Sequence, residues 1–475
     1  MDSTRDIADQ LLEIFPFEAT DIQKKAMVYL ERFLVSTKDN CCFLLKGFAG
    51  TGKTTLISAL VKYLKIVNIS TVLMAPTGRA AKVFSKYSGQ AAFTIHKLIY
   101  ARKNMPDGSS RFVLKENKWK NAIFVVDEAS MISDQAGLLQ NQWHKSSLLD
   151  DLMEYVFTGE NCKLILLGDT AQLPPVHMDM SPALDKNHLQ SSYNLTIADL
   201  ELDTVLRQKK HSGILTNATL LRHQLNRKEI SQPLLDISDA HDVIAIDSYQ
   251  FQDELEDAFR NFGEEGVLVV TRSNKNANLY NHQVRRVVFG REEELEAGDK
   301  IMVVRNNYHW LKDDKKASYI ANGDMAEVLN IQRKEEIYGH NFADVSIRLL
   351  DYEHAPELTL KLILDSIYED GPSLPDGKRK ALINQLAEEY LELGSRRLIY
   401  QAVTKNEFFN ALEIKFGYTV TCHKSQGGQW PIVFIDLGYF TEDMLDRNFI
   451  RWLYTALTRA SEKVYLVNFP EALIS

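Results

Sequence analysis

Two kinds of hydrophobic pattern alternate along the first half of the chain. Continuously apolar runs of about four to eight residues suit strands that are buried on both faces. Between these runs, apolar residues recur every three or four positions, as in Thr55–Leu64, which is the spacing of an amphipathic helix. The alternation predicts a parallel sheet with helices on both faces. We expect its strands at Cys41–Lys46, Thr71–Ala75, Ala122–Val126 and Lys163–Leu167.

The same alternation begins again near Gly213, but it is interrupted. From about residue 307 to residue 414, charged runs, short β-like segments and an acidic helix over Lys378–Leu393 replace the regular pattern. We therefore predict a second α/β lobe that is split by an insertion. Its strands are expected at Gly266–Thr271, Asp299–Asn306, Gly417–Val420, Val433–Ile435 and Lys463–Val467. The predicted division is 1–210 for the first lobe, 211–306 with 415–475 for the second lobe, and 307–414 for the insertion.

A turn sequence interrupts the first lobe between two of its predicted strands. Met105-Pro-Asp-Gly-Ser109 combines a proline, which sets φ, with a glycine, which permits positive φ. Aromatic and cationic residues flank this turn on both sides. We predict a protruding β-hairpin within residues 98–120.

Composition limits the classes of protein to which the chain can belong. Its 475 residues are too many for one hydrophobic core, so we expect several domains. No apolar run reaches the roughly 18–20 residues of a membrane span, and the N-terminus has no apolar signal segment. The four cysteines form no CxxC pair, which fits reduced core cysteines in a cytoplasmic protein. The net charge of −9 excludes a wholly basic surface but permits a locally basic groove.

The segment Gly47–Thr54 matches the phosphate-binding loop G-x-x-x-x-G-K-[ST]. Its glycines let backbone N–H groups surround the phosphates, and the following helix adds a favourable dipole. Lys53 would reach the β- and γ-phosphates, and the Thr54 hydroxyl would help to hold Mg²⁺. A chance match in a glycine-rich turn is the alternative, but the strand before the loop and the helix after it argue against chance. The expected nucleotide-binding residues are Gly47, Ala49, Gly50, Thr51, Gly52, Lys53, Thr54 and Thr55.

Acidic and amide residues follow two later strands of the first lobe. Asp127, at a strand end, is placed to hold Mg²⁺, and Glu128 is placed to polarise the attacking water as general base. An acidic pair that merely opens the next helix is the plainer interpretation, which the phosphate loop upstream disfavours. Gln172, in Gly168-Asp-Thr-Ala-Gln-Leu-Pro174, is placed to sense the γ-phosphate or the water, although an ordinary loop is the alternative.

Hydrolysis also requires positive charge near the transferring γ-phosphoryl group. Arginines that supply it can change the rate by ~10³–10⁵-fold. Arg207 and Arg459 are the candidates, and both lie outside the sheet that carries the phosphate loop. A site that uses them is complete only when two lobes close on it. By composition alone, either arginine would be interpreted as an ordinary surface residue.

Together, these motifs resemble those of superfamily 1 helicases, and most closely those of the 5′→3′ RecD/Dda-like branch. Eight segments match the family in order over about residues 20–465, among them Ala75–Ala81, Phe93–Leu98, Tyr418–Gly427 and Leu453–Arg459. The resemblance implies two RecA-like lobes of the P-loop NTPase class that hydrolyse ATP with Mg²⁺ between them. It also implies a small β-barrel in the insertion and a hairpin that acts as a pin at the duplex fork.

The resemblance further implies which residues bind the base and the strand. Gln23 stands where the family's adenine-reading glutamine precedes the phosphate loop. His96 and His423 lie in strand-binding motifs, although either could be a structural histidine that bonds backbone. Small hydroxyls and a few cations that grip phosphates suit a motor that steps on any sequence. The expected strand-binding residues are Pro76, Thr77, Arg79, Thr94 and His96 in the first lobe, and Thr421, His423, Lys424 and Ser425 in the second.

The leading hypothesis is an ATP-dependent helicase, a monomer that moves 5′→3′ on single-stranded DNA and unwinds duplex at a fork. Polarity and the preference for DNA come from the resemblance alone. The helix within 307–414 exceeds a minimal barrel, so this insertion is a candidate surface for a protein partner. Three alternatives stay open: a translocase on RNA or DNA that strips proteins without unwinding, a P-loop kinase or GTPase, and a DNA-binding regulator with a decayed ATPase. The intact Lys53, Asp127 and Glu128 argue against decay.

Overall fold

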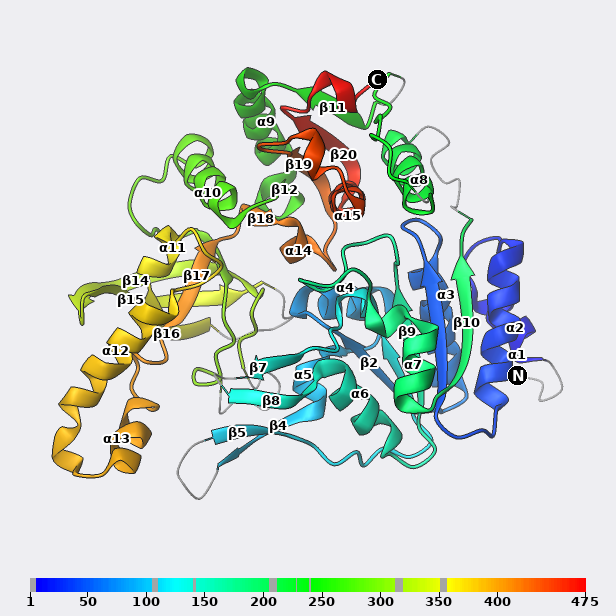
Figure 1. The fold of residues 1–475 in the computed structure, drawn as a ribbon, viewed down its shortest axis with the longest axis horizontal. Helices are drawn as coiled ribbons and strands as arrows, with labels where there is room; N and C mark the ends of the chain where they lie inside the picture. The colour runs from blue at the N-terminus through cyan, green and yellow to red at the C-terminus, as the bar shows by residue number, and fades with distance from the viewer. Residues whose placement is uncertain are drawn as a thin grey trace.

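The computed structural model describes residues 6–104, 110–139, 142–204, 212–227, 229–238, 241–311, 319–350 and 357–475. These residues form two α/β lobes and a small closed barrel (Figure 1). In this view the first lobe lies below the second, and the barrel with its helical extension lies at the left. The predicted fold class is therefore confirmed.

The first lobe is a parallel sheet of six strands in the order β10-β1-β9-β6-β2-β3. Apolar side chains cover both faces of this sheet, because α1, α2 and α3 pack on one face and α5, α6 and α7 on the other. All four strands predicted for this lobe are confirmed. The strands are β1 (Cys41–Gly47), β2 (Thr71–Ala75), β3 (Ala92–Thr94), β6 (Ile123–Val126), β9 (Lys163–Gly168) and β10 (Thr196–Leu202). The helices are α1 (Ile7–Ile14), α2 (Asp21–Val35), α3 (Lys53–Ile66), α4 (Gly78–Ser88), α5 (Ile95–Ile99), α6 (Leu148–Phe157) and α7 (Lys186–Tyr193).

The second lobe is a parallel sheet of five strands in the order β11-β20-β19-β12-β18. One face packs against α9 and the barrel, and the other face packs against α15, α8 and parts of the first lobe. The strands are β11 (Val243–Ile246), β12 (Val267–Thr271), β18 (Thr419–Thr421), β19 (Trp430–Asp436) and β20 (Ala460–Val467). The helices are α8 (Gly213–Leu225), α9 (Ser248–Gly266), α10 (Asn274–Val288), α14 (Cys422–Ser425) and α15 (Arg447–Leu457).

The insertion is a closed barrel of five strands that carries additional helices. The predicted helix over Lys378–Leu393 is present as α12, which ends at Glu389. The barrel strands are β13 (Lys300–Val303), β14 (Met325–Ile337), β15 (His340–Leu349), β16 (Glu357–Ile363) and β17 (Leu412–Phe416). Between β16 and β17 lie α11 (Asp365–Tyr368), α12 (Asp376–Glu389) and α13 (Arg396–Val403).

The barrel is larger than the predicted insertion, because it begins at Lys300 and ends at Phe416. The prediction that Asp299–Asn306 belongs to the sheet of the second lobe is wrong. Its strand, β13, pairs antiparallel with β14 and β17 of the barrel. A short apolar run indicates that a strand is buried, but it does not indicate which sheet the strand joins.

Two hairpins extend from the first lobe. Strands β4 (Tyr100–Asn104) and β5 (Ser110–Leu114) pair antiparallel within the predicted range 98–120, while the turn at 105–109 lies outside the described residues. The ring of Phe112 on β5 lies 4.4 Å from the ring of Tyr308, so this hairpin contacts the barrel region. The second hairpin, β7 (Ala136–Leu139) with β8 (Gln142–Ser147), is not predicted by the sequence pattern.

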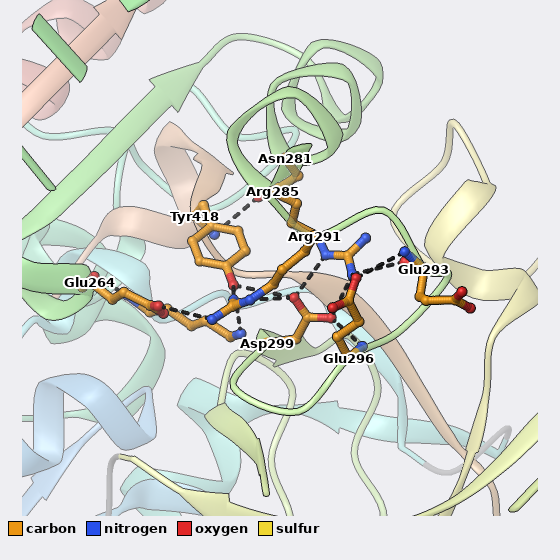
Figure 2. A network of polar contacts seen from close by, with 9 residues as sticks. Glu264, Asn281, Arg285, Arg291, Glu293, Glu296, Asp299 and Tyr418 are labelled. Carbon is orange, nitrogen blue, oxygen red and sulfur yellow. Dashed lines mark hydrogen bonds and ion pairs between the residues drawn. The ribbon is translucent and has the colours of Figure 1, made fainter. Parts of the chain in front are cut away.

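A buried ion-pair network joins the second lobe to the barrel (Figure 2). Asp299, directly before β13, is fully buried, and its carboxylate accepts two hydrogen bonds of 2.8 Å from the Arg285 guanidinium of α10. Arg291 approaches the same carboxylate at 3.3 Å. The hydroxyl of buried Tyr418 accepts a 3.0 Å hydrogen bond from the N–H of Lys300, the first residue of β13. The first barrel strand is thereby fixed to the second lobe by charged and aromatic groups together.

All four cysteines are buried and free, as the sequence predicts. Among the helices in the described ranges, none is long and apolar enough to cross a lipid bilayer.

Candidate active site and nucleic-acid channel

The phosphate loop connects the C-terminal end of β1 with the N-terminus of α3. Gly52, directly before the first helical residue, has φ 83° and ψ 20°, in the left-handed region that favours glycine. Gly47 allows a close approach of the chain, because a Cβ there would lie 2.9 Å from Thr51 Oγ1 and 3.0 Å from Leu202 Cβ. Both glycines are therefore required by the shape of the loop.

Backbone carbonyl oxygens of this loop accept hydrogen bonds from two side chains, Lys53 and Gln23. The Lys53 ammonium donates hydrogen bonds to the carbonyl oxygens of Gly47 and Phe48, the latter at 3.0 Å. The side-chain amide of buried Gln23 donates to the Thr51 carbonyl at 3.0 Å, so the start of α2 is tied to the loop. A role for Gln23 in reading adenine stays a prediction. The remaining predicted nucleotide contacts in the loop and the first turn of α3 are Ala49, Gly50, Thr54 and Thr55.

Asp127 and Glu128 follow β6 at the same edge of the sheet. Glu128 has a left-handed backbone, with φ 52°, and its N–H donates a 2.8 Å hydrogen bond to Asp127 Oδ1. Burial and the adjacent Asp127 charge raise the pKa of Glu128 to about 7, although Arg459 and Lys53 act to lower it. A carboxylate with a pKa near the working pH suits a general base. The predicted role of Glu128 is thus chemically feasible at this position.

Gln172 lies in the segment after β9, with its side chain only 7% exposed. Within the part of the chain that the structure describes, its Oε1 atom has no hydrogen-bond partner. An unpaired buried amide oxygen costs about 1–3 kcal/mol. The position therefore fits a group whose partner is supplied by a substrate or by the water that attacks it.

Arg459 approaches this site from the second lobe. Its side chain is 4% exposed, and its guanidinium donates hydrogen bonds to the carbonyl oxygens of Thr455 at 3.0 Å and of Gly428 at 3.1 Å. It lies close enough to Glu128 for its charge to act on the pKa of that carboxyl. Arg207, the other predicted arginine, lies outside the described residues, so its role stays a prediction.

A cavity of about 390 Å³ lies where the first lobe, the second lobe and the barrel meet. Both lobes contribute predicted strand-binding residues to its walls, and the barrel contributes residues that the sequence did not indicate. The predicted residues that line it are Pro76, Thr77, Arg79, Thr94, His96, His423 and Lys424. The unpredicted residues include Lys300, Asn306, Tyr319 and Asn322 of the barrel region, and Gln426 and Trp430 of the second lobe.

Two predicted strand-binding residues do not line this cavity. Ser425 is fully buried, and its hydroxyl donates a 2.7 Å hydrogen bond to the Cys422 carbonyl, so its side chain satisfies its own short helix. Thr421, directly before α14, is also absent from the lining. The barrel residues were missed because an insertion carries no motif, although the turn Asn322-Gly-Asp324 was a usable signal.

This cavity, which we call the strand channel, carries less positive charge than its residue types suggest, because burial favours the neutral forms of its basic groups. Burial lowers the pKa of His96 to about 4 and that of Lys424 to about 8, and it also lowers the pKa of His423. His96 is therefore neutral at pH 7 and can act as a hydrogen-bond donor and acceptor. Arg79 lies over the Trp430 ring at 3.8 Å, so one of the channel cations is held against an aromatic face from the opposite lobe.

Two family models of known proteins match this chain. Residues 22–245 match a family model described as an AAA domain, and residues 416–467 match one described as a UvrD-like helicase C-terminal domain. Together the two matches cover more than half of the chain. The first match covers most of the first lobe and continues into the second lobe as far as β11, and the second match falls on the second lobe.

Individual relatives agree with these matches. The chain is 24% identical to the ATP-dependent RecD2 DNA helicase of Deinococcus radiodurans, over 89% of this chain and 46% of the relative. It is 24% identical to the ATP-dependent DNA helicase dda of Enterobacteria phage T4, over 66% of this chain and 68% of the relative. The crystal structure of the Pif1 helicase from Candida albicans aligns with 97% of this chain and 96% of its own, at 15% identity and a TM-score of 0.48. This chain thus spans less than half of the length of the RecD2 relative. It belongs to the superfamily 1 helicases, in the branch of RecD- and Dda-like proteins.

Proposed function

We propose that this protein is an ATP-dependent DNA helicase that moves 5′→3′ on single-stranded DNA and separates duplex. The observation that carries the proposal is a single site made by both lobes. The first lobe supplies Lys53, Asp127, Glu128 and Gln172, and the second supplies Arg459. The strand channel lies between the same bodies. A change in the distance between the lobes would therefore alter hydrolysis and strand binding together.

ATP is the substrate that the phosphate loop would hold. Glu128 would take a proton from the attacking water, Gln172 would orient that water, and Arg459 would stabilise charge on the γ-phosphoryl group. The Thr54 hydroxyl and Asp127 are hard oxygen donors of the type that Mg²⁺ prefers. Bound there, Mg²⁺ would supply neutralising charge to the phosphates. Asp127 would hold the cation through its carboxylate, whose Oδ1 atom also accepts a hydrogen bond from the Glu128 N–H.

The strand would lie in the channel between two sets of contacts. Thr77 and Arg79 would hold it on the first lobe, and His423 and Lys424 on the second. A phosphate beside Lys424 would raise the pKa of that ammonium again, because an opposite charge favours the charged form. Alternate release of the two sets would give directed stepping. One chain contains both lobes, so a monomer is sufficient for this scheme.

The first experiment compares ATP hydrolysis with and without single-stranded DNA, in the wild type and in Lys53→Ala. We expect strong stimulation by DNA in the wild type and none in the variant. Duplexes with a 5′ or a 3′ single-stranded tail then test polarity, and only the 5′-tailed duplex should be unwound. A wild type that DNA and RNA both fail to stimulate would overturn the motor and favour a P-loop kinase or GTPase.

A second experiment separates a helicase from a translocase that only strips proteins. The β4–β5 hairpin is held against the barrel region by the contact of Phe112 with Tyr308. Shortening the chain between residues 101 and 115 should abolish unwinding and leave DNA-stimulated hydrolysis intact. Unwinding at the wild-type rate in this variant would reject the hairpin as the pin.

A further inference from the structure

The hydroxyl of Tyr454 connects the two lobes at the ATP site. Tyr454 lies on α15 of the second lobe and is 1% exposed. The backbone N–H of Ala49, in the phosphate loop of the first lobe, donates a 2.9 Å hydrogen bond to this hydroxyl. The hydroxyl in turn donates a 2.7 Å hydrogen bond to Asp169 Oδ2. One oxygen of the second lobe therefore bonds to two separate loops of the first.

Both loops belong to the hydrolysis machinery. Ala49 is the third residue of the phosphate loop, four positions before Lys53. Asp169 directly follows β9, is 1% exposed, and opens the segment that carries Gln172. Its charge also acts on Glu128 and raises the pKa of that carboxyl, after the larger effects of burial and of Asp127. A shift of Tyr454 would therefore change the positions of both the phosphate loop and the segment that carries Gln172.

Neighbouring groups on the second lobe hold the same segment at its other end. The Leu173 N–H donates a 2.9 Å hydrogen bond to Thr455 Oγ1, and Gln426 Nε2 donates one of 2.9 Å to the Leu173 carbonyl. Thr455 also accepts the hydrogen bond from Arg459 through its carbonyl oxygen. The segment 169–173 is therefore hydrogen-bonded at both ends to the second lobe, which also carries Arg459.

We propose that Tyr454 is a positioning residue that couples closure of the lobes to ATP hydrolysis. Its hydroxyl sets the phosphate loop, the Gln172 segment and helix α15, which leads into Arg459, in one relative position, so that they become productive together. This inference rests on the proposed function, because it assigns a device within that motor. Burial raises the pKa of Tyr454 well above its ordinary value, so the hydroxyl stays protonated and remains a donor to Asp169.

The test is Tyr454→Phe, which removes the hydroxyl and keeps the ring. A buried hydrogen bond to a carboxylate is worth about 10–100-fold in an equilibrium or a rate. We expect kcat for DNA-stimulated hydrolysis to fall by about this factor, and the ratio of stimulated to basal rates to fall with it. Affinities for a fluorescent ATP analogue and for single-stranded DNA should change less than about threefold. The matched control is Tyr465→Phe, a tyrosine of the same lobe stacked on Phe434, which should behave like the wild type.

A double-mutant cycle separates coupling from simple support of the fold. If Tyr454 acts in part through Asp169, the loss of kcat in the variant with Tyr454→Phe and Asp169→Asn should be smaller than the product of the two single losses. Fully additive losses would overturn the inference, as would an unchanged kcat in Tyr454→Phe. Equal losses of kcat and nucleotide affinity would assign a structural role and overturn it too. A wild type without DNA stimulation would instead overturn the proposed function, so the two failures are distinguishable.

Discussion

The second lobe has two neighbours, and it is joined to them by different chemistry. Toward the barrel it uses a buried ion pair, in which Arg285 and Asp299 are 4% and 0% exposed and share two hydrogen bonds of 2.8 Å (Figure 2). Toward the first lobe it uses separate hydrogen bonds, such as the one from Tyr454 to the Asp169 carboxylate, and the contact of Arg79 with the Trp430 ring. Separating the first junction would leave a charge buried without its partner, which is far costlier than exchanging a hydrogen bond with water.

This difference indicates which bodies move. The barrel and the second lobe should move as one body, while the first lobe opens and closes against both. The first lobe contacts the barrel through a 3.1 Å hydrogen bond between Thr94 and Tyr319, and through a hydrogen bond from the Lys82 ammonium to the Leu350 carbonyl. The cavity that would hold the strand is lined by residues of the first lobe, the second lobe and the barrel, so movement of the first lobe would change its width.

The largest effect is expected at Arg459, which lies at the junction between the two lobes and would supply positive charge to the γ-phosphoryl group. Arg459→Ala should lower DNA-stimulated hydrolysis by about 10³-fold or more, because the γ-phosphoryl group loses its stabilising charge. Nucleotide affinity, measured by titration with a fluorescent analogue, should stay within a few fold of the wild type. Arg260→Ala, at an exposed arginine of the same lobe, is the control. Loss of nucleotide binding in Arg459→Ala would contradict this role.

The charged junction should respond in stability and not in chemistry. Asp299→Ala leaves the buried Arg285 guanidinium without its partner, which should cost about 3–5 kcal/mol in the free energy of unfolding. Urea denaturation measures this change. Asp257→Ala breaks an exposed pair with Arg260, where both side chains are more than half exposed, and should cost less than about 1 kcal/mol. Equal, small changes in the two variants would contradict the rigid connection.

The pH dependence of hydrolysis tests whether the second lobe acts on the general base. Because the pKa of Glu128 is raised to about 7, the base is increasingly protonated below that pH. kcat/KM for ATP should therefore fall about tenfold per pH unit on the acid side. Arg459 lowers the pKa of Glu128, so in Arg459→Ala the acid limb, followed on residual activity, should move to higher pH. A profile that is flat down to pH 6, or a limb that moves to lower pH, would contradict this assignment.

The smallest effect is expected at the neutral hydrogen bond between Thr94 of the first lobe and Tyr319 of the barrel region. Tyr319→Phe removes the hydrogen bond to Thr94 and keeps the ring, which stacks 4.9 Å from Tyr308. The free energy of unfolding should change by about 0.5–1.5 kcal/mol, the net worth of one neutral hydrogen bond. Urea denaturation beside Asp299→Ala gives the comparison. A loss as large as that of Asp299→Ala would show that both junctions are rigid.

The shared location of the candidate ATP-site residues can be predicted from the sequence, because these residues lie close to strands. Lys53, Asp127 and Gln172 each come within a few residues of a buried apolar run, so their shared edge of the sheet follows from parallel topology. Residues whose role depends on orientation are less predictable. Ser425 lies in the expected motif, yet its hydroxyl turns to the Cys422 carbonyl.

Contacts between separate bodies could not be predicted from the sequence. β13 is an apolar run that would suit either the second lobe or the barrel, and only its antiparallel partners decide. Tyr319 lines the cavity because the barrel docks there, and no local sequence pattern indicates this contact. A partial signal exists for Tyr454, because a hydroxyl inside the largely buried helix α15 requires a partner.

Distances between labels across the ATP cycle test the central claim most directly. The four native cysteines are buried, so cysteines introduced at exposed positions can be labelled selectively. Ile66→Cys with Tyr249→Cys reports on the two lobes, and Tyr249→Cys with Gln332→Cys reports on the second lobe and the barrel. On addition of single-stranded DNA and a non-hydrolysable ATP analogue, energy transfer should change in the first pair and stay constant in the second. A constant first pair, or a second pair that changes as much as the first, would contradict the account.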